Sequence, residues 1–497
     1  MKRPREYAIL FFACVLFHVA GTWTLPLIDR DEPRFAEASR EMIERGDYVV
    51  PHFNGDLRLD KPPLAYWAQA ASYRIFGEND FAARFPSAVA AALVALSIFA
   101  WGKRVGGERV GWRAAIIFTL SLQVFIHAKA AVADMWLVLF VTTAHWAGWE
   151  LMESKQTSNA QRRTPNAEWM WWWAFYVSLA LGFLAKGPIA WVPLLTVACT
   201  KIFSPDVAFA KPFKFARGIL VMLAIVALWG VPALVQTRGE FLSVGLGRHV
   251  VARSIVTMEG HGAQSLAGYL LLLPFYFVTI FVSFFPWSMK LPWLCKTLRR
   301  DHDKSRLRQG GYGGQVDNYL LAGSALLFVI FTLIKTKLPH YTLPAFPLLA
   351  LWLARHWQNV TGKRRGFFRV VAIATTALWL LFAIVMPPLV AGSFPAYALF
   401  RQARNDLRPE MEFGGVEYAE PSLVWYFRRQ VKGFFTPLNE KRAVAFMEKA
   451  GPRFVVMPTS LARTVFGNHS DWKTFSTQGI NIAKGKHVEL TLVLKAE

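Results

Sequence analysis

The chain has few cysteines and lacks a glycine-rich phosphate loop, and each absence argues against a class of protein. It contains three cysteines: Cys14 and Cys199 lie within apolar runs and Cys295 lies beside a basic loop. This number and placement give no disulfide framework, and redox chemistry is not favoured. Without a glycine-rich loop to cradle phosphates, nucleotide binding is not favoured either. Internal repeats and low-complexity tracts are also lacking.

Charge is scarce as well. Only 18% of the 497 residues are charged, whereas 54% are hydrophobic and 15% are aromatic. Such a chain is too apolar for an ordinary soluble protein. Its apolar runs have the length of membrane-crossing helices, about 20 residues each, which indicates a polytopic helical bundle and not a β-barrel. We expect eleven spans, within a range of ten to thirteen, at about residues 7–27, 82–101, 113–128, 132–151, 169–185, 187–203, 217–236, 268–288, 318–335, 340–356 and 367–387.

The net charge of +23 is unevenly placed along the chain. Basic clusters fall in every second loop, which is the positive-inside pattern of a membrane protein and not a nucleic-acid surface. The pattern puts the N-terminus in the cytoplasm, with the first span as an uncleaved signal anchor. The clusters lie at Lys2–Arg5, Lys103–Arg113, Arg162–Arg163, Lys201–Arg217, Lys296–Arg308 and Lys363–Arg369.

The composition changes after the last span. We expect residues 1–390 to form the membrane domain and residues 391–497 to form a small α/β domain. Phe454–Met457 and the alternating stretch His487–Leu494 are typical of strands, and Asn439–Lys449 is typical of a helix. An odd number of spans puts this domain on the outer side of the membrane, where its expected role is that of a lid, a scaffold or a partner surface.

The first outer loop, residues 28–80, combines many charges with a position beside the bilayer. Pro33 favours the first turn of a surface helix at Arg34–Arg45, which Gly46 ends. Asn54-Gly55 predicts a turn, and Pro62-Pro63 opens a second helix that runs to about Phe76.

Acidic residues on the outer side are candidate catalytic groups. Asp31 and Glu32 lie at the end of the first span, where a carboxylate is costly and therefore a functional candidate. The alternative is that they only cap the helix, because acids favour helix N-termini. Asp134 opens an apolar span on the same side and is an N-cap, a second site carboxylate, or both. Two such acids suit a site that stabilises a developing sugar cation and orients a nucleophile.

Positive side chains occur on the same outer face. Each of the lysines has a simpler explanation, because a lysine at the end of a span often only reaches to the headgroups. Taken together with the acids, the cations suit a phosphate or pyrophosphate held at the membrane surface. They are Lys61, Lys186, Arg248, His249, Arg253, Lys335 and Lys337. The outer histidines His249, His261 and His340 lack the close spacing of a zinc site, so the sequence does not favour metal binding.

Several motifs resemble bacterial polyprenyl-phosphate-dependent glycosyltransferases. They are DRDEPRFAEASREMIERGDYVVPHFNGDLRLDKPPLAYW at Asp29–Trp67, FGENDFAARFPS at Phe76–Ser87, the lone Asp134, FLAKGP at Phe183–Pro188 and KLPHYTLPAFP at Lys337–Pro347. The likeness is greatest to the lipid A 4-amino-4-deoxy-L-arabinose transferases, which are related to the protein O-mannosyltransferases. It covers about residues 7–390 and implies a GT-C-type bundle with a periplasmic C-terminal domain.

The resemblance also implies roles for residues. Asp31 becomes the catalytic carboxylate and Asp134 the second acid, while the carrier phosphate is bound by Arg34 and Lys61 and, less securely, by Lys186, Arg253 and Lys337. The remaining candidate substrate contacts are Glu32, Asp60, Tyr66, His249, His261, His340 and Tyr341. Asp60 is a departure, because the arabinose transferases tend to have glutamate there, and this leaves the identity of the sugar open.

The implied function is inverting transfer of 4-amino-4-deoxy-L-arabinose from undecaprenyl phosphate to a lipid A phosphate. An anionic phosphate acceptor needs no strong base, whereas a hydroxyl acceptor would require Asp31 to take a proton. Transfer of mannose, galacturonic acid or another sugar to protein, core oligosaccharide or glycan is the alternative, and a transporter or lipid flippase is a weaker one. We expect a monomer that requires no cofactor, with a divalent metal as the alternative.

Overall fold

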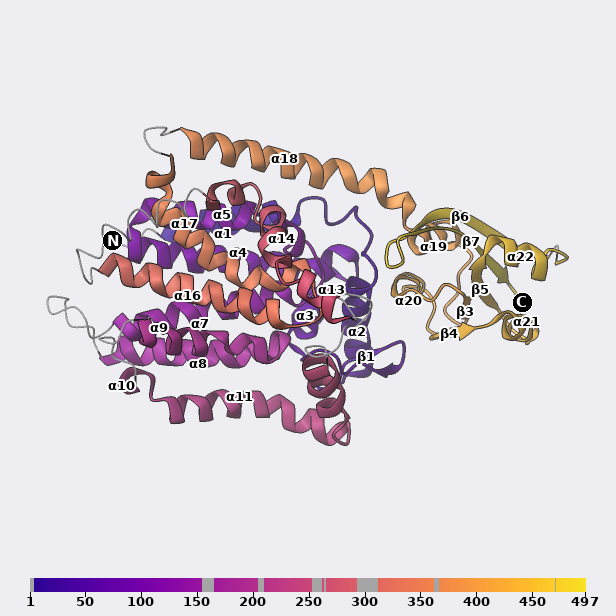
Figure 1. The fold of residues 1–497 in the computed structure, drawn as a ribbon. Helices are drawn as coiled ribbons and strands as arrows, with labels where there is room; N and C mark the ends of the chain where they lie inside the picture. Colours follow the sequence, from indigo (N-terminus) through magenta and orange to yellow (C-terminus); the bar gives the residue numbers. More distant parts are fainter. Residues whose placement is uncertain are drawn as a thin grey trace.

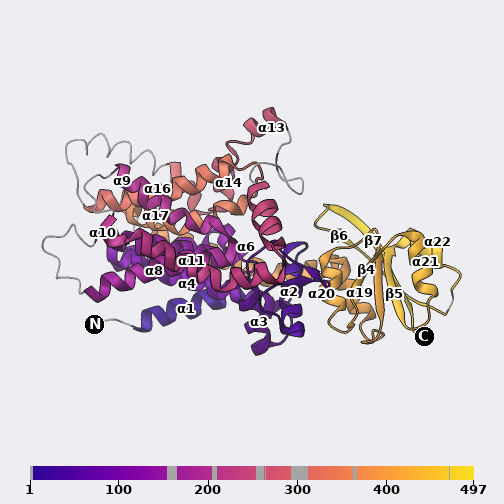
Figure 2. The same cartoon turned by 90° about the horizontal axis from the view of Figure 1, so that it is seen from below.

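The computed structural model describes residues 4–153, 165–203, 210–252, 262, 265–292, 312–361, 366–469 and 471–497. A bundle of long helices forms most of the molecule, and a domain built on a sheet lies beyond one end of it (Figure 1). The view turned by 90° shows the same arrangement, with the N-terminal end of α1 at the far end of the bundle (Figure 2). The predicted combination of a helical bundle and a small C-terminal α/β domain is confirmed.

The bundle consists of helices that run mostly side by side (Figure 1). Its α-helices are α1 (Pro4–Val19), α4 (Asp80–Gly106), α5 (Glu108–Leu120), α6 (Leu122–His127), α7 (Asp134–Glu153), α8 (Pro165–Lys186), α9 (Val192–Phe203), α10 (Ala210–Phe213), α11 (Phe215–Gln236), α13 (Leu266–Leu271), α14 (Phe275–Ser283), α16 (Tyr312–Leu333), α17 (Phe346–Thr361) and α18 (Phe367–Val390). Short 3₁₀ turns lie at η1 (Pro188–Trp191), η3 (Trp287–Lys290), η4 (Pro339–Ala345) and η5 (Ala391–Ser393), and η2 (Leu242–Ala252) is a π-helix.

Within the described residues, four helices are by themselves long and apolar enough to cross a bilayer: Asp80–Gly106, Phe215–Gln236, Gly314–Leu333 and Phe367–Ser393. Several predicted spans are interrupted. The segment predicted at 113–128 breaks at Ser121, whose backbone is extended, and the one at 187–203 begins with the 3₁₀ turn η1 after Gly187. The segment at 268–288 turns before Pro274. The count of eleven spans therefore stays a prediction.

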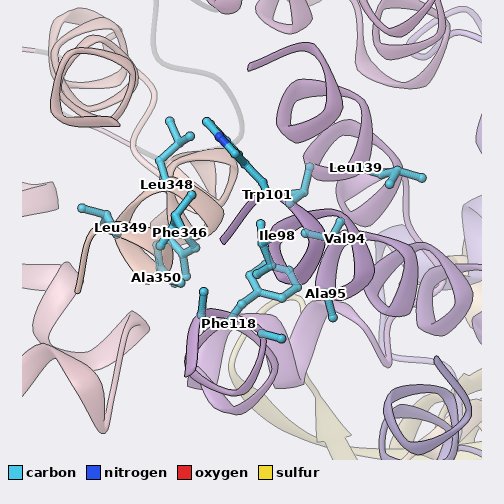
Figure 3. Packing of buried hydrophobic residues seen from close by; sticks show 14 of the residues in the cluster. Val94, Ala95, Ile98, Trp101, Phe118, Leu139, Phe346, Leu348, Leu349 and Ala350 are labelled. Atoms are coloured by element: carbon cyan, nitrogen blue, oxygen red, sulfur yellow. The ribbon is translucent and has the colours of Figure 1, made fainter. Parts of the chain in front are cut away.

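Helix α4 lies at the centre of the bundle core. Ile98 and Trp101 are fully buried and belong to the same apolar cluster as Phe118 of α5 (Figure 3), and the Trp101 ring packs edge-on against Tyr319 of α16. At Gly102 of α4 an added Cβ would lie 2.8 Å from the Cα atom of Gly111 in α5. Small residues at this crossing let the two backbones approach closely, as in other helix pairs within membranes.

The first outer loop has the elements that the sequence predicts: α2 (Asp31–Arg45), the two-stranded hairpin β1 (His52–Phe53) and β2 (Asp56–Leu57), and α3 (Leu64–Phe76). Pro33 lies in the first turn of α2, and Gly46 ends it with a φ of +67°. Asn54 and Gly55 form the hairpin turn with φ values of 53° and 85°, because a two-residue turn of this kind requires positive φ.

The C-terminal domain is a five-stranded sheet with helices on both faces. Its elements are α19 (Pro395–Ala403), β3 (Glu412–Val416), α20 (Pro421–Phe427), β4 (Phe435–Leu438), α21 (Glu440–Glu448), β5 (Arg453–Pro458), α22 (Thr459–Phe466), β6 (Lys473–Asn481) and β7 (Lys486–Lys495). The strand order is β4-β3-β5-β7-β6, with β3 parallel to β4 and β5 and the other pairs antiparallel. Strands β5 and β7 and helix α21 confirm predictions, whereas β3, β4 and β6 were not predicted.

Helix α2 differs from the predicted surface helix. Its polar residues Glu37, Arg40 and Glu41 are each at most 1% exposed. They are buried because α20 of the C-terminal domain packs along α2, and Tyr73 of α3 shares one apolar cluster with Trp425 of α20. The charges that suggested a solvated face are therefore paired inside an interface.

Candidate active site

Two adjoining cavities lie at the end of the bundle that carries the first outer loop. One is about 710 Å³ and is mostly apolar; the other is about 470 Å³ and is lined by many charged residues. They meet at a shared set of residues from four segments: Asp60, Lys61, Asp134, Lys186, His340 and Tyr341. All six are among the residues that the sequence singles out, although they are up to 281 positions apart, from Asp60 to Tyr341.

The apolar cavity extends from this junction along the bundle. Its walls come from η1, α9, α11 and α16, and include Leu194, Leu195, Val226, Trp229 and Ile330. A wall of aliphatic and aromatic side chains with charges at only one end suits a ligand with a hydrocarbon chain and an ionic headgroup.

Asp134 and Lys186 form the central ion pair of the junction. Asp134 is the first residue of α7, where the helix dipole favours an anion, and its side chain is 11% exposed. Lys186 ends α8, and its Nζ atom lies 2.5 Å from Oδ1 of Asp134. The Nε2 atom of His340 lies 4.0 Å from the same oxygen. Each of the two buried charges is therefore compensated by the other.

A metal ion fits this cluster poorly. His127, Asp134 and His340 could each offer one ligand atom, and these atoms lie within 4.8 Å of one another. However, the Lys186 ammonium group already contacts Asp134. A divalent cation there would repel that ammonium by several kcal/mol, since two unit charges about 4 Å apart interact by about 4 kcal/mol even at an effective dielectric of about 20.

Asp31 lies in the first turn of α2 and lines the polar cavity with its side chain exposed. Arg34, one turn further along α2, lines the same cavity, and Lys61 lies at its border with the apolar one. The structure therefore brings the predicted catalytic carboxylate and three of the predicted phosphate-binding cations, Arg34, Lys61 and Lys186, to one cavity.

Asp60 and Tyr66 are linked through a residue that sequence reasoning missed. Arg58 donates to the Tyr66 hydroxyl at 2.9 Å and forms an ion pair with Asp60 at 3.1 Å. Tyr66 is fully buried and stacks on Phe35, and burial raises the pKa of its phenol well above the usual value. Tyr66 therefore supports the cavity wall from behind, whereas Arg58 and Asp60 line it.

Glu32 does not line either cavity. It is 5% exposed and forms an ion pair with Arg84 of α4 at 2.7 Å, and it accepts from the backbone N–H groups of Ile28 and Ala131, each at 2.7 Å. One carboxylate thus ties the segment before Asp31 to the segment before Asp134. In place of the predicted substrate contact, the structure shows a side chain that connects the two halves of the site.

We expect Glu32→Gln to lower the free energy of unfolding by about 2 kcal/mol, the range of a hydrogen bond to a charged group. The loss should stay below the cost of an isolated buried charge, because Arg84 also donates to the carbonyls of Thr22 and Pro26. Melting temperature in detergent is the measurement, with the exposed Glu448→Gln as the control. Equal melting temperatures for the two variants would contradict this prediction.

Lys337 lies apart from the cavities, although the motif predicts a phosphate contact. It is 6% exposed, and its Nζ atom donates to the carbonyls of Phe331, Thr332 and Ile334 at the end of α16. Burial lowers its pKa to about 8. In this structure Lys337 caps a helix.

Three other predicted residues cannot be placed at the site. Arg253 and His261 lie outside the described residues, and for His249 only the backbone, within η2, is described. Besides Arg58, two other residues that were not predicted contribute to the site or its support: His127 beside His340, and Arg84, which pairs with Glu32. Arg84 lies within the quoted motif FGENDFAARFPS, so its presence there was the available signal.

Comparisons with known proteins agree with this architecture. Residues 60–230 match the family model of the dolichyl-phosphate-mannose-protein mannosyltransferases. The chain is 29% identical over 380 residues to an undecaprenyl phosphate-alpha-4-amino-4-deoxy-L-arabinose arabinosyl transferase of Edwardsiella ictaluri, covering 74% of this chain and 62% of that protein. A second such transferase, of Sodalis glossinidius, is 29% identical over 429 residues, 82% of this chain and 72% of that protein.

Solved structures show the same fold. ArnT from Cupriavidus metallidurans bound to undecaprenyl phosphate has a TM-score of 0.75 with 18% identity, over 98% of each chain. An archaeal oligosaccharyltransferase of Archaeoglobus fulgidus, in complex with zinc and sulfate, has a TM-score of 0.53 with 12% identity, over 97% of this chain and 72% of that one.

Fold and sequence together confirm the predicted resemblance to polyprenyl-phosphate-dependent membrane glycosyltransferases of the GT-C type. The chain is similar in sequence to the 4-amino-4-deoxy-L-arabinose transferases, and its residues 60–230 are similar to the O-mannosyltransferases. The aligned region spans less than two thirds of the Edwardsiella ictaluri relative, at 62% of its length.

Proposed function

We propose that this chain transfers 4-amino-4-deoxy-L-arabinose from undecaprenyl phosphate to a lipid A phosphate, with inversion at the anomeric carbon. The observation that carries the proposal is the meeting of an apolar and a charged cavity at Asp134 and Lys186. A polyprenyl phosphate has the same division between a long apolar chain and an ionic head. The similarity to aminoarabinose transferases supports the choice of sugar and acceptor.

The apolar cavity would hold the isoprenoid chain of the donor. Its phosphate would then lie at the junction near Lys61 and Lys186, with Arg34 in the wall of the polar cavity. The sugar would enter the polar cavity, where Asp31 is exposed. In this placement the phosphate of the donor faces cations, and the anomeric carbon faces a carboxylate.

The proposed reaction breaks the bond between the anomeric carbon and the phosphate oxygen, and the electron pair leaves with the phosphate. Lys61 and Lys186 neutralise this leaving group as its charge develops. An acceptor oxygen forms the new bond from the opposite face of the sugar, which inverts the configuration. Asp31 stabilises positive charge on the sugar and orients the attack; an anionic phosphate acceptor needs no proton removed.

We also propose that the N-terminus is cytoplasmic and that the site and the C-terminal domain face the periplasm of the inner membrane. The basic loops, the eleven predicted spans and the position of α2, α3 and the C-terminal domain at one end of the bundle support this orientation (Figure 1). Cysteine labelling in intact cells tests it: an engineered cysteine in the exposed turn at Gly485 should react with a reagent that does not cross the inner membrane. Labelling only after lysis would contradict it.

The donor half of the reaction can be tested with purified protein. Incubation with undecaprenyl-phosphate-linked aminoarabinose and lipid A should release undecaprenyl phosphate at a rate that depends on lipid A, as followed by chromatography. Release with mannose-linked donor but not with the aminoarabinose-linked one would contradict the proposed sugar.

We propose that transfer requires no metal, because Lys186 already neutralises Asp134 at the place where a cation would bind. Incubation with EDTA followed by desalting should leave the rate within about twofold of the untreated value, since a metal that supplied Lewis-acid catalysis would account for several kcal/mol. A loss of activity that zinc or manganese restores would overturn this prediction.

A further inference from the structure

The C-terminal domain holds the backbone that leads into Asp31. Of the four residues before Asp31, three contact the segment Glu420–Phe427, which consists of α20 and the residue before it. The fourth, Ile28, donates its N–H to Glu32. Leu27 N–H donates to the Tyr426 hydroxyl at 2.7 Å, and Arg30 Nε lies 3.6 Å from the Glu420 carboxylate. The Asp29 carboxylate accepts from the N–H of Ser422 at 2.9 Å and from its hydroxyl at 2.5 Å. The position of Asp31 is thus set from outside its own loop.

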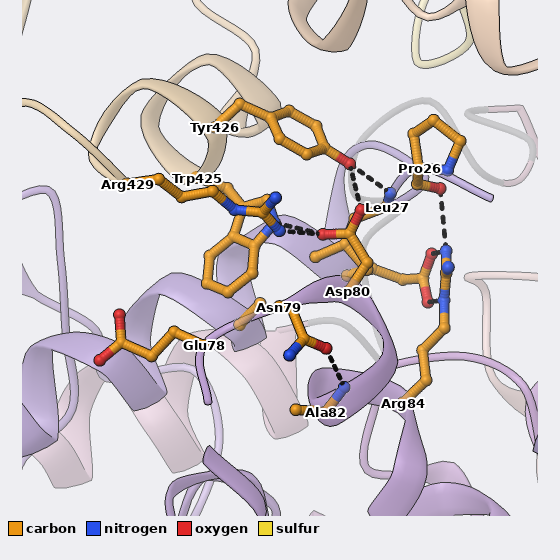
Figure 4. A network of polar contacts seen from close by, with 12 residues as sticks. Pro26, Leu27, Glu78, Asn79, Asp80, Ala82, Arg84, Trp425, Tyr426 and Arg429 are labelled. Atoms are coloured by element: carbon orange, nitrogen blue, oxygen red, sulfur yellow. Dashed lines mark hydrogen bonds and ion pairs between the residues drawn. The ribbon is translucent and has the colours of Figure 1, made fainter. Parts of the chain in front are cut away.

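Tyr426 serves two parts of the site with one hydroxyl group. It accepts from Leu27 N–H and donates to Oδ2 of Asp80 at 3.0 Å (Figure 4). The other oxygen of Asp80 accepts from the Trp425 indole at 2.8 Å and from Arg429 at 2.5 Å. Asp80 is the first residue of α4, so α20 is bonded both to the first loop and to the central helix of the bundle.

The same domain also holds the hairpin that forms another wall of the polar cavity. Asn54 in the hairpin turn and Phe435 of β4 exchange two hydrogen bonds, Asn54 Nδ2 to the Phe435 carbonyl at 2.9 Å and Phe435 N–H to Asn54 Oδ1 at 2.7 Å. Phe53, Asp56 and Leu57 of this hairpin line the polar cavity. Two walls of the cavity therefore depend on contacts with the C-terminal domain.

Buried charges fix the relative position of α2 and α20 at their interface. Arg428 pairs with the buried Glu37 and with the exposed Glu44 of α2, and the guanidinium group of Arg40 lies 4.1 Å from the ring centre of Trp425. Breaking a buried pair of this kind leaves a charge without compensation, which is costly. A sliding motion of α20 along α2 is disfavoured for this reason.

We propose that the segment Glu420–Phe427 is a positioning element, which holds Asp31 and the hairpin in the geometry that transfer requires. Among the residues that the structure describes, none after Pro344 lines either cavity. The C-terminal domain therefore acts on catalysis through the position of other residues, with Tyr426 and Ser422 as the positioning residues. The effect on turnover rests on the proposed transfer at Asp31, whereas the effect on loop geometry does not.

Two conservative variants test the inference. Tyr426→Phe removes only the hydroxyl group, and Ser422→Ala removes the hydroxyl group that donates to Asp29 and also forms a hydrogen bond with Tyr418. The matched control is Tyr397→Phe, which removes a hydroxyl from the neighbouring ring in the same domain, 5.2 Å from that of Tyr426. Because small displacements of a reacting group are costly, we expect about a tenfold fall in kcat for each test variant with little change in KM for the donor.

A double-mutant cycle separates positioning from general destabilisation. If Tyr426 acts through Asp31, then Tyr426→Phe should lower kcat by less than about twofold once Asp31→Asn is already present. An undiminished tenfold fall in that background would overturn the inference. So would unchanged kcat in both single variants while the wild type is active.

Hydrogen exchange tests the geometric part without any need for activity. Amides of residues 27–35 should exchange faster in Tyr426→Phe and Ser422→Ala than in the wild type or Tyr397→Phe, because their segment has lost a tether. Unchanged exchange in this segment would overturn the inference even if transfer takes place. An inactive wild type whose variants show the faster exchange would instead contradict the proposed function alone.

Discussion

Asp31→Asn is expected to lower kcat for transfer by about 10²- to 10⁴-fold, the range that a positioned acid or base contributes. The substitution keeps the size of the side chain and removes the charge that would face the anomeric carbon. Because the Asp31 side chain is exposed in the polar cavity, the melting temperature of the variant should stay close to that of the wild type. Single-turnover transfer from the undecaprenyl-linked donor is the measurement.

Asp56→Asn is the matched control for Asp31, since it removes another exposed carboxylate from the same cavity. We expect a loss of less than about tenfold, because Asp56 lies in the hairpin and has no charged substrate group assigned to it. Equal losses in the two variants would show that the cavity needs negative charge in general and would refute a specific role for Asp31.

Lys186→Met is expected to have two effects. It removes the cation next to the leaving phosphate, which should lower kcat by about 10²- to 10³-fold. It also leaves Asp134 buried without its partner at 2.5 Å, which should lower the free energy of unfolding by about 3 to 5 kcal/mol. Transfer rate and melting temperature in detergent report the two effects separately.

The double variant Lys186→Met with Asp134→Asn distinguishes these effects. Removing both charges should restore most of the stability, because no unpaired buried charge remains, but it should not restore transfer. The control Lys335→Met removes an exposed lysine on the same side of the bundle that lines neither cavity. Recovery of transfer in the double variant would contradict the assignment of Lys186 to the phosphate.

Local sequence signals were sufficient for the first outer loop. Pro33, Gly46 and Asn54-Gly55 each impose a backbone conformation by themselves, and the structure places a helix start, a helix end and a hairpin turn there. The alternation of the predicted spans put Asp134 and Lys186 on the same side of the bundle, and the structure places them together there. Their direct contact could not be predicted, because it depends on how α7 and α8 pack.

The contacts made by the C-terminal domain could not be predicted from the sequence for another reason. Asp29 and Ser422 are 393 positions apart, and nothing in the local pattern of either residue points to the other. Charges in α2 such as Glu37 and Arg40 look like a solvated face until the partner helix is known. Lys337 shows the opposite error, since a lysine in a functional-looking motif caps a helix through its own backbone neighbours.

The proposed transfer is tested most simply by the mass of lipid A from cells that lack their own lipid A sugar transferase and express this chain. We expect a wild-type product heavier by one aminoarabinose residue, and an unmodified lipid A with Asp31→Asn at equal expression. Unmodified lipid A with the wild type would contradict the proposed acceptor, and full modification with Asp31→Asn would contradict the site.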